Sequence, residues 1–203
     1  MPLLMPSLVA LLISSAPDAG TPLPIPGDME VLRPAIERNE AGLRNAPAAR
    51  PEDVASIDAL MSALYRSISG PAGAPRDWDR VRSFFHPSAR MVPLHPAKSG
   101  GATRLFALAL SPDEYISRAA QSFRAQDFYE LEVGRRVDGF GTLVNVLSAY
   151  EARRSPDGPA IRRGVNSLVL FNDGTRWWIL QFTWLDEKEA RLKVPLPFET
   201  AKR

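Results

Sequence analysis

The stretch YEARRSPDGPAIRRGVNSLVLFNDGTRWWILQFTW, residues 150–184, decides the fold of this chain. It holds long runs rich in aliphatic, β-branched and aromatic residues, separated by the turn sequences Ser155–Gly158 and Asn172–Gly174. Runs of this composition between clusters of Gly, Pro, Asn and Asp are typical of β-strands joined by tight turns. The stretch predicts an antiparallel meander, with aromatic residues crowded onto its last strand. The expected strands are 143–154, 161–171 and 176–184.

Three helices are expected before this meander. Apolar residues recur at three- and four-residue steps over Pro51–Ile68, which predicts one amphipathic helix. Asp77 is expected to cap a second, short helix that ends before Pro87. Ser111 and Glu114 form a capping box for a third helix over residues 111–123.

The remaining strands are predicted on both sides of the third helix. Ala89–Leu94 is expected to form a short strand, followed by a loop at Lys98–Thr103. From Tyr129 to Val133 apolar residues alternate with two glutamates, which is the period of a β-strand. Asp138-Gly139 is a hairpin sequence and is expected to turn this strand into the next.

Residues 1–19 have features of a secretory signal. The apolar run Leu8–Ile13 is followed by small residues around Ala16 and Ala19. No Lys or Arg precedes the run, and Pro17 is unfavourable for cleavage directly after Ala16. We expect export, to the periplasm; a mis-assigned start or a disordered extension of a cytoplasmic protein is the alternative.

Three further segments follow. Residues 20–51 are rich in Pro and Ala and are expected to form a linker, in which Pro34 argues against a helix at Met29–Arg44. The folded domain is expected at residues 52–186. Residues 187–203 are charged and are expected to form a solvated tail.

Composition excludes several functions. The 25 Lys+Arg against 23 Asp+Glu give a net charge of +2, too balanced for the electrostatic footprint of a nucleic-acid partner. The absence of Cys excludes disulfides and thiol catalysis. The spacing of the two histidines, His86 and His95, matches no common metal-ligand pattern, so we expect no metal and no cofactor. The N-terminal apolar run is too short to span a bilayer.

The order of elements resembles the nuclear transport factor 2-like superfamily, which includes ketosteroid isomerases, scytalone dehydratases and SnoaL-like polyketide cyclases. The resemblance extends over residues 52–186. Within the superfamily, the chain is most similar to bacterial members of unassigned function. It implies an α+β fold in which three N-terminal helices pack on a strongly curved, mostly antiparallel sheet, forming a cone with an internal pocket. The segments that carry it are DWDRVRSFFHPSARMVPL at 77–94, SPDEYISRAAQSF at 111–123 and YEARRSPDG…RGVNSLVLFNDGTRWWI at 150–179.

A strand register follows if Asp173-Gly174 is a two-residue turn. Ser167 then lies opposite Leu180 and Val165 opposite Phe182, because cross-strand partners sum to 347. The resemblance to the isomerases implies that this face of the last strand lines the pocket. The expected pocket residues are Val165, Ser167, Leu180, Phe182, Trp184, Arg163 and Tyr150.

Two points depend on this register. The face of Tyr150 depends on whether Ser155–Gly158 makes a two- or three-residue loop, because a slip of one residue reverses it. The opposite face of the last two strands is strongly apolar, and a homodimer through the sheet is expected to cover it. Its members are Leu168, Leu170, Trp177 and Ile179.

The resemblance implies an incomplete catalytic set. The isomerase base position falls near Pro93, which cannot accept a proton, and the donor positions fall at Ser167 and at Leu64, next to Tyr65. His86 is the strongest acid–base candidate, because histidine titrates near neutral pH. Tyr65 and Ser167 are weaker candidates beside it.

Three functions stay open. The first is a module that holds a small, mostly apolar ligand, which the few polar groups of the expected pocket favour. The second is a lyase, isomerase or cyclase acting on a small hydrophobic substrate. The third is a structural homodimer without a ligand. The fold does not choose between them, because it hosts many activities.

Overall fold

A computed structural model of the 203-residue chain describes residues 27–99, 102–195 and 197–198. The signal predicted for residues 1–19 lies outside this part. The chain divides into two units, Met1–Glu40 and Ala41–Arg203, and the second contains the whole sheet. Among the described residues, no helix is both long enough and apolar enough to cross a bilayer.

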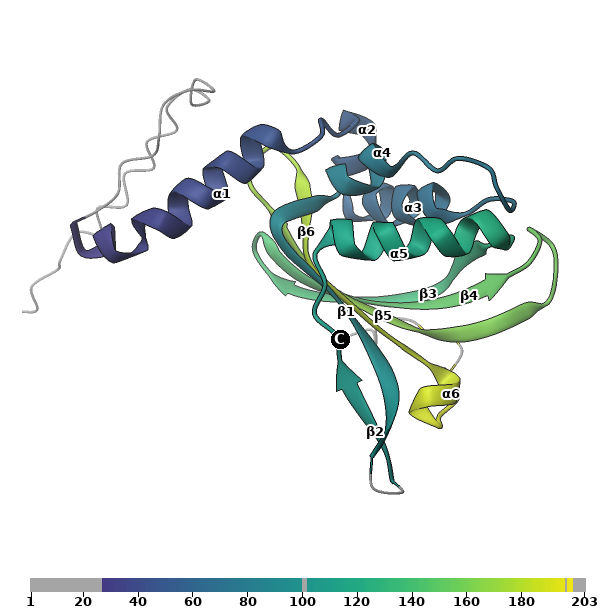
Figure 1. Cartoon of the computed structure of the whole chain (residues 1–203). Coiled ribbons are helices and arrows are strands. Elements are labelled where there is room, and N and C mark those ends of the chain that lie inside the picture. The colour runs from purple at the N-terminus through teal and green to yellow at the C-terminus, as the bar shows by residue number, and fades with distance from the viewer. Residues whose placement is uncertain (1–26, 100–101, 196, 199–203) are drawn as a thin grey trace, which may run out of the picture. The chain divides into compact units, whose positions relative to one another are not determined.

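The second unit has six strands and a set of short helices in the order shown in Figure 1. The described elements of the whole chain are η1 (Gly27–Leu32), α1 (Arg33–Asn45), α2 (Pro51–Val54), α3 (Ile57–Ile68), α4 (Trp78–Ser83), β1 (Phe85–Ser99), β2 (Ala102–Ala107), α5 (Pro112–Ala125), β3 (Tyr129–Phe140), β4 (Leu143–Arg153), β5 (Ala160–Asn172), β6 (Trp177–Asp186) and α6 (Glu187–Ala190).

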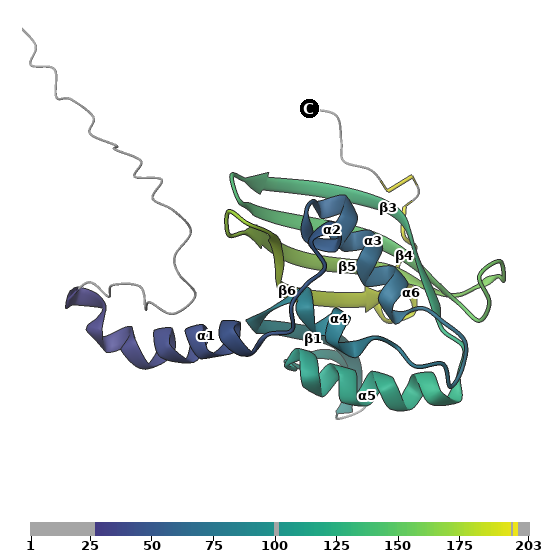
Figure 2. The same ribbon diagram turned by 90° about the horizontal axis from the view of Figure 1, so that it is seen from above.

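The strands form one mixed sheet in the order β2-β1-β6-β5-β4-β3. Every neighbouring pair is antiparallel except β1 and β6, which run parallel. The helices α3, α4 and α5 lie on one side of the curved sheet, with α3 against β3 and α5 against β1 (Figures 1 and 2). The predicted α+β class, with helices on a curved and mostly antiparallel sheet, is confirmed. We call the helix-covered side of the sheet its inner face and the opposite side its outer face.

The helix boundaries differ from the prediction in two places. The helix expected over Pro51–Ile68 is divided into α2 and α3, because the Ser56 side chain caps a new helix by accepting a hydrogen bond from the backbone three residues on, at 3.1 Å. Pro34 does not prevent α1, because it lies in the first turn, where a helix needs no backbone donor. The predicted caps of α4 and α5, Asp77 and the Ser111–Glu114 capping box, are confirmed.

The strand expected at Ala89–Leu94 is part of a much longer one. β1 has 15 residues, and its second half pairs with β2, in the segment where a loop was expected at Lys98–Thr103. Prolines such as Pro93 and Pro96 conceal this strand in the sequence, because each removes a backbone donor from the ladder. The turn between β3 and β4 is also displaced. Asp138-Gly139 lies within β3 and pairs with residues of β4, and the chain reverses at Gly141, which has a φ of 59°.

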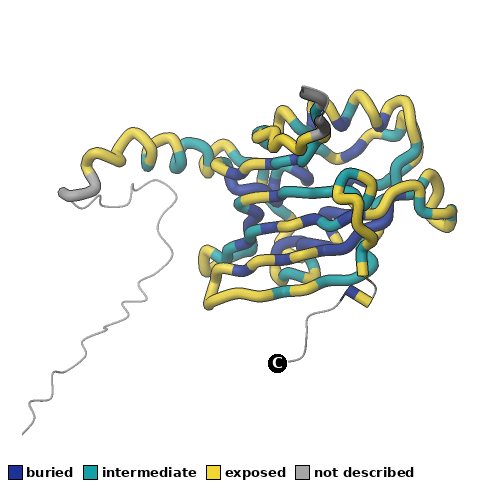
Figure 3. The backbone as a smooth tube through the Cα atoms, turned by 90° about the horizontal axis from the view of Figure 1, so that it is seen from below, coloured by how far each residue is buried: buried dark blue, intermediate teal, exposed yellow. Residues whose placement is uncertain are grey.

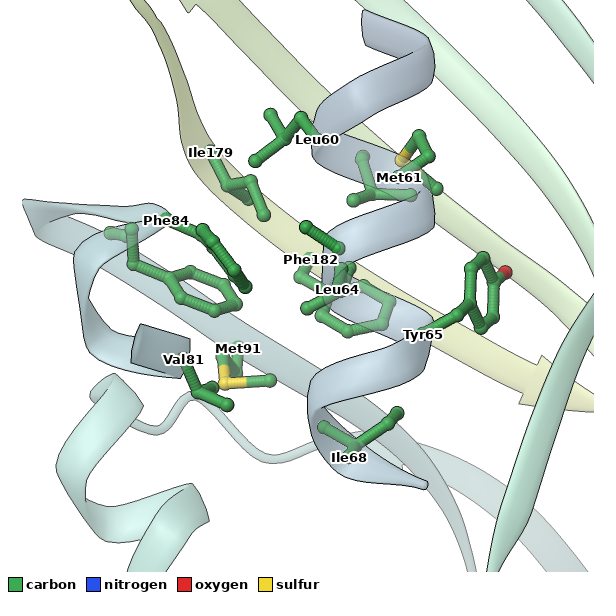
Figure 4. Packing of buried hydrophobic residues seen from close by; sticks show 14 of the residues in the cluster. Leu60, Met61, Leu64, Tyr65, Ile68, Val81, Phe84, Met91, Ile179 and Phe182 are labelled. Carbon is green, nitrogen blue, oxygen red and sulfur yellow. The ribbon is translucent and has the colours of Figure 1, made fainter. Parts of the chain in front are cut away.

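The core lies between α3, α4 and the inner face. Leu60 and Met61 of α3, Phe84 after α4 and Ile179 of β6 are fully buried around Phe182 (Figure 4). Burying each of these side chains stabilises the fold by about 1.5–3 kcal/mol. Buried and exposed positions alternate along the first half of β4, as expected for a strand covered on one face (Figure 3).

The predicted register between β5 and β6 is wrong. Asn172 pairs with Trp177, so the connection has four residues, and Asp173 Oδ1 accepts hydrogen bonds from the backbone amides of Thr175 and Arg176 at 2.7 and 2.9 Å. A bulge at Leu180 then adds one further residue to β6. The two extra residues in the turn alone would leave each side chain on its predicted face of the sheet. The bulge adds one more residue, so beyond it the residues of β5 lie on the opposite face from the one predicted.

The reversal moves the apolar residues of β5 to the inner face. Leu168 lies opposite Phe182, and Leu168, Leu170 and Ile179 are all buried under the helices. They do not form an exposed apolar face, so the argument that a dimer must cover them is wrong. Ser167 is exposed on the outer face instead.

The C-terminal segment is not wholly solvated. Phe198 is only 5% exposed, and the Arg136 guanidinium lies 4.3 Å from the centre of its ring. Gly134 in β3 makes room for it, because a Cβ atom there would lie 2.9 Å from the Phe198 Cβ. The expectation of a solvated tail is therefore wrong at Phe198.

Candidate functional site

A cavity of about 460 Å³ lies between α5 and the inner face. This volume is within the range of pockets that bind small organic molecules. Ten of the 21 lining residues are polar or charged and eleven are apolar or aromatic, so the lining is more polar than expected. The lining residues are Ile68, Leu94, His95, Tyr115, Arg118, Ala119, Ser122, Phe123, Gln126, Phe128, Glu130, Tyr150, Ala152, Arg154, Ile161, Arg162, Asn166, Phe182, Trp184, Asp186 and Glu189.

Aromatic rings from α5 and β6 border the cavity. Tyr115 meets Trp184 nearly edge-on, with 5.6 Å between the ring centres, and Trp184 lies 5.3 Å from Phe182. Phe123 of α5 stacks on Phe128 at 4.7 Å. These positions follow from the two periodicities: alternate residues of a strand, and residues one or two turns apart on a helix, share one face.

Glu130 of β3 is the carboxyl group with the most unusual environment. Its Oε1 accepts a hydrogen bond from Asn166 Nδ2 at 3.1 Å, while its Oε2 accepts none from any described residue. Burial, together with the nearby Asp186 carboxylate, raises the pKa of Glu130 to about 7, against the lowering effects of Asn166 and Arg162. Near neutral pH this group therefore exchanges its proton readily.

A chain of hydrogen bonds leads from Asn166 of β5 through Tyr65 of α3 to Glu132 of β3. Asn166 Nδ2 also donates to Tyr65 Oη at 3.0 Å, and Tyr65 Oη lies 2.6 Å from Ser148 Oγ. Ser148 donates to Glu132, whose two oxygens are held by Arg135. Because the Ser148 hydroxyl donates its hydrogen bond to Glu132, it accepts a hydrogen bond from the Tyr65 hydroxyl. Burial raises the pKa of Tyr65 above its usual value.

A second polar group lies on β4, β5 and β6. The Tyr150 hydroxyl donates to Asp186 Oδ1, and Arg162 Nε lies 3.1 Å from Asp186 Oδ2. Burial raises the pKa of Asp186. Gly164, opposite Tyr150, is required here, because a Cβ atom at that position would lie 2.6 Å from the Tyr150 hydroxyl.

The structure separates the residues that the sequence predicted for the pocket. Those that line the cavity are Tyr150, Phe182 and Trp184. Those outside its lining are Val165, Ser167 and Arg163, on the outer face of β5, and Leu180, in the bulge of β6. The physical reason is the bulge at Leu180, which reverses the relation between β5 and β6: Phe182 and Trp184 of β6 keep the inner face, while the expected members of β5 turn outward.

His86 lies outside the cavity lining. Its ring is 5.7 Å from the ring centres of Phe171 and Trp178, and its Nδ1 forms a 2.7 Å hydrogen bond with Ser88 Oγ. Burial lowers the pKa of His86 and favours its neutral form. This packing is that of a structural side chain, and the proposed acid–base role of His86 loses its geometric basis.

Glu130 and Asn166 are the residues that sequence reasoning missed. The available signal was polarity at unusual positions: Asn166 interrupts the apolar run of β5, and Glu130 lies in a strand whose neighbours are apolar. Over the described ranges, no three His, Asp or Glu side chains gather as metal ligands.

No protein-family model and no curated protein matches this chain. Several solved structures do. A nuclear transport factor 2-like protein of unknown function from Silicibacter pomeroyi is 17% identical, with a TM-score of 0.43, over 65% of this chain and 93% of its own.

Two further structures are similar. A nuclear transport factor 2-like protein with a cystatin-like fold from Novosphingobium aromaticivorans is 10% identical, with a TM-score of 0.45, over 76% of this chain and 85% of its own. A protein of unknown function with a cystatin-like fold from Nostoc punctiforme is 8% identical, with a TM-score of 0.48, over 64% and 87%. At these identities the likeness concerns the fold and assigns no ligand or reaction.

Proposed function

We propose that this chain binds a small organic molecule in the cavity between α5 and the inner face. The observation that carries the proposal is an open space of about 460 Å³ whose lining combines aromatic rings with an unpartnered oxygen of Glu130. Protein interiors are otherwise closely packed, and Glu130 Oε2 is free to accept a hydrogen bond from a molecule in this space. A ligand would supply both the missing volume and the missing partner.

The lining suggests how such a molecule would lie. A flat apolar body fits between Tyr115, Phe182 and Trp184, where burial and ring contacts favour it. A polar group of the ligand would face Glu130 and Asn166. Such a division between an apolar body and a few orienting polar groups is common in ligand pockets.

A large side chain that fills the cavity should weaken ligand binding. Ala119 lines the cavity from α5, whereas Ala125 is exposed at the end of the same helix. We expect Ala119→Phe to weaken the binding of N-phenyl-1-naphthylamine, a neutral fluorescent probe, by at least about tenfold, and Ala125→Phe to leave it unchanged. Fluorescence titration measures both. Equal binding by the two variants, with unchanged thermal unfolding, would remove the cavity as the binding site.

A second candidate function is acid–base catalysis, as in a lyase, isomerase or cyclase. The pKa of about 7 at Glu130 favours it, because a general acid or base works best near the ambient pH. Glu130 would abstract a proton next to a carbonyl group. With 2-indanone in D₂O, wild-type protein should accelerate exchange of the α-protons, and Glu130→Gln should lose this acceleration while still binding N-phenyl-1-naphthylamine. NMR follows the exchange.

We also propose that the outer face forms a homodimer. Leu143 and Leu147 of β4 are 48% and 39% exposed there, beside the half-buried Val165 and Val169 of β5. Apolar residues gathered on one side of a sheet support association through that side. This surface takes the place of the wrongly assigned apolar face, and the dimer is compatible with either function of the cavity.

A further inference from the structure

Three carboxyl groups line the cavity, and only one of them forms an ion pair with another described residue of the lining. Asp186 forms an ion pair with Arg162, at 3.1 Å, and also accepts a hydrogen bond from the Tyr150 hydroxyl. Glu130 Oε2 and the buried Glu189 Oε2 have no hydrogen-bond partner among the described residues. Two of the three carboxyl groups in the lining, Glu130 and Glu189, therefore have no ion-pair partner among the described residues.

The three arginines of the lining, Arg118, Arg154 and Arg162, are all exposed to water. Arg118 of α5 and Arg154 after β4 are exposed, and Arg154 Nη1 donates to the Asp127 carbonyl at 2.8 Å. Charges in water interact weakly, whereas charges out of water interact strongly. Arg162 is the cation that acts on Glu130, and it is shared with Asp186.

Aromatic rings supply a second and independent feature. Trp184, Tyr115 and Phe182 have ring centres within 5.6 Å of their neighbours and border the same cavity as Glu130. The faces of aromatic rings attract ammonium groups, and the attraction grows when the site is shielded from water. Rings and unpaired carboxyl oxygens in one cavity thus favour the same kind of ligand group.

We infer that the ligand is a small aromatic or apolar amine, whose protonated nitrogen pairs with Glu130 while its ring lies against Trp184. This inference rests on the proposed binding function and names its ligand class. An ammonium group can donate a hydrogen bond to Glu130 Oε2 and also pair with the charge of this carboxylate, and hydrogen bonds between two charged partners are stronger than those between neutral ones. A neutral donor satisfies only the hydrogen bond.

Three probes with one indole ring test the charge preference: tryptamine, which is cationic, tryptophol, which is neutral, and indole-3-acetate, which is anionic. At pH 8, where Glu130 is mostly ionised, isothermal titration calorimetry should show tryptamine binding at least about tenfold more tightly than tryptophol. Indole-3-acetate should bind most weakly.

Variants locate the preference. Glu130→Gln should remove the advantage of tryptamine over tryptophol, whereas Glu130→Asp should retain part of this advantage. Asp157→Asn changes the net charge equally at an exposed turn outside the lining and should have no effect. Thermal unfolding of each variant verifies that it folds.

The outcomes separate the two proposals. Equal affinity for all three probes, or tightest binding of indole-3-acetate, overturns the amine inference and leaves the binding function intact. An advantage of tryptamine that persists in a folded Glu130→Gln variant overturns the role of Glu130. If none of the three probes, nor N-phenyl-1-naphthylamine, binds the folded protein, the proposed binding function fails as well.

Discussion

Glu130 carries a free-energy cost that an exposed glutamate does not. Its carboxyl group lies in the cavity lining with one oxygen bonded to Asn166 and the other without a partner among the described residues. Burial disfavours the charged form, so protonation stabilises the folded state. The residue is thus kept at some expense of stability, which is common where a side chain serves binding or catalysis.

The cost of Glu130 should appear in the pH dependence of unfolding. Its pKa is about 7 when folded, against a usual value of 4.5, so the folded state binds more protons between these values and the free energy of unfolding falls as pH rises from about 4.5 to 7. Glu130→Gln should lose about 1–3 kcal/mol of this fall. Urea denaturation at pH 5 and pH 8 measures the difference.

The exposed Glu52 provides the control for this measurement. Glu52→Gln should retain the wild-type dependence on pH, because it removes a carboxyl group that is exposed and lies outside the cavity lining. If Glu130→Gln and wild type show the same slope between pH 5 and pH 8, the carboxyl of Glu130 is not held out of water.

Local polarity did not identify Glu130 from the sequence. Charged residues that alternate with apolar ones normally point to solvent, but β3 points Glu130 and Glu132 toward α3 and the cavity, while Leu131 is exposed. The inversion depends on how the distant β4 and β5 curve the sheet and on the partners that Tyr65 and Asn166 bring. These are contacts between distant segments, which a local pattern does not contain.

At the scale of elements, one ion pair joins α2 to α4. Both oxygens of Asp53 accept hydrogen bonds from the Arg80 guanidinium at 2.7 Å, and the Asp53 side chain is 3% exposed. Hydrogen bonding to Arg80 lowers the pKa of Asp53. A buried carboxylate held in this fork-like geometry stabilises the contact between the two short helices.

Asp53→Asn should destabilise the protein by about 1–3 kcal/mol, because it leaves the guanidinium of Arg80 without its charged partner. Asp79→Asn removes the exposed pair with Arg82 and should cost less than about 1 kcal/mol. Chemical denaturation at pH 7 measures both. Equal losses for the two variants would show that burial of Asp53 adds nothing to the pair.

The elements themselves were largely predictable, and the register was not. Caps such as Asp77 and Ser111 act within three residues, so the sequence contains the whole signal. The bulge at Leu180 has no such local signature, because it results from the pairing of β6 with β5 on one side and β1 on the other. One added residue in β6 placed Arg163, Val165 and Ser167 of β5 on the outer face instead of in the predicted pocket.

At the scale of the molecule, the outer face carries the proposed homodimer. Leu147 lies near its centre on β4, and Asn145 is the adjacent exposed residue on the same face of the strand. Phe198 occupies the β3 side of this face, at Gly134 and Arg136. The apolar area available to a partner therefore lies over β4 and β5.

Leu147→Asp should convert the dimer to a monomer of 22.4 kDa, because it places a charge inside the apolar contact. Asn145→Asp places the same charge two residues away at a position that is already polar, and it should shift the equilibrium much less. Sedimentation velocity distinguishes the two species. A monomeric wild type, or a dimeric Leu147→Asp variant, would refute association through this face.

The position of β6 between β1 and β5 also constrains the biosynthesis of the protein. Residues 177–186 leave the ribosome after every other strand, yet they join the hairpin β1–β2 to the meander β3–β5, pairing Met91 with a residue about ninety positions later. Until then the nascent chain holds two partial sheets with unpaired edges, and its cavity lacks Phe182 and Trp184. Long-range closure of this kind is slow and leaves strand edges open to aggregation, so we expect the sheet to close only after the last strand is made.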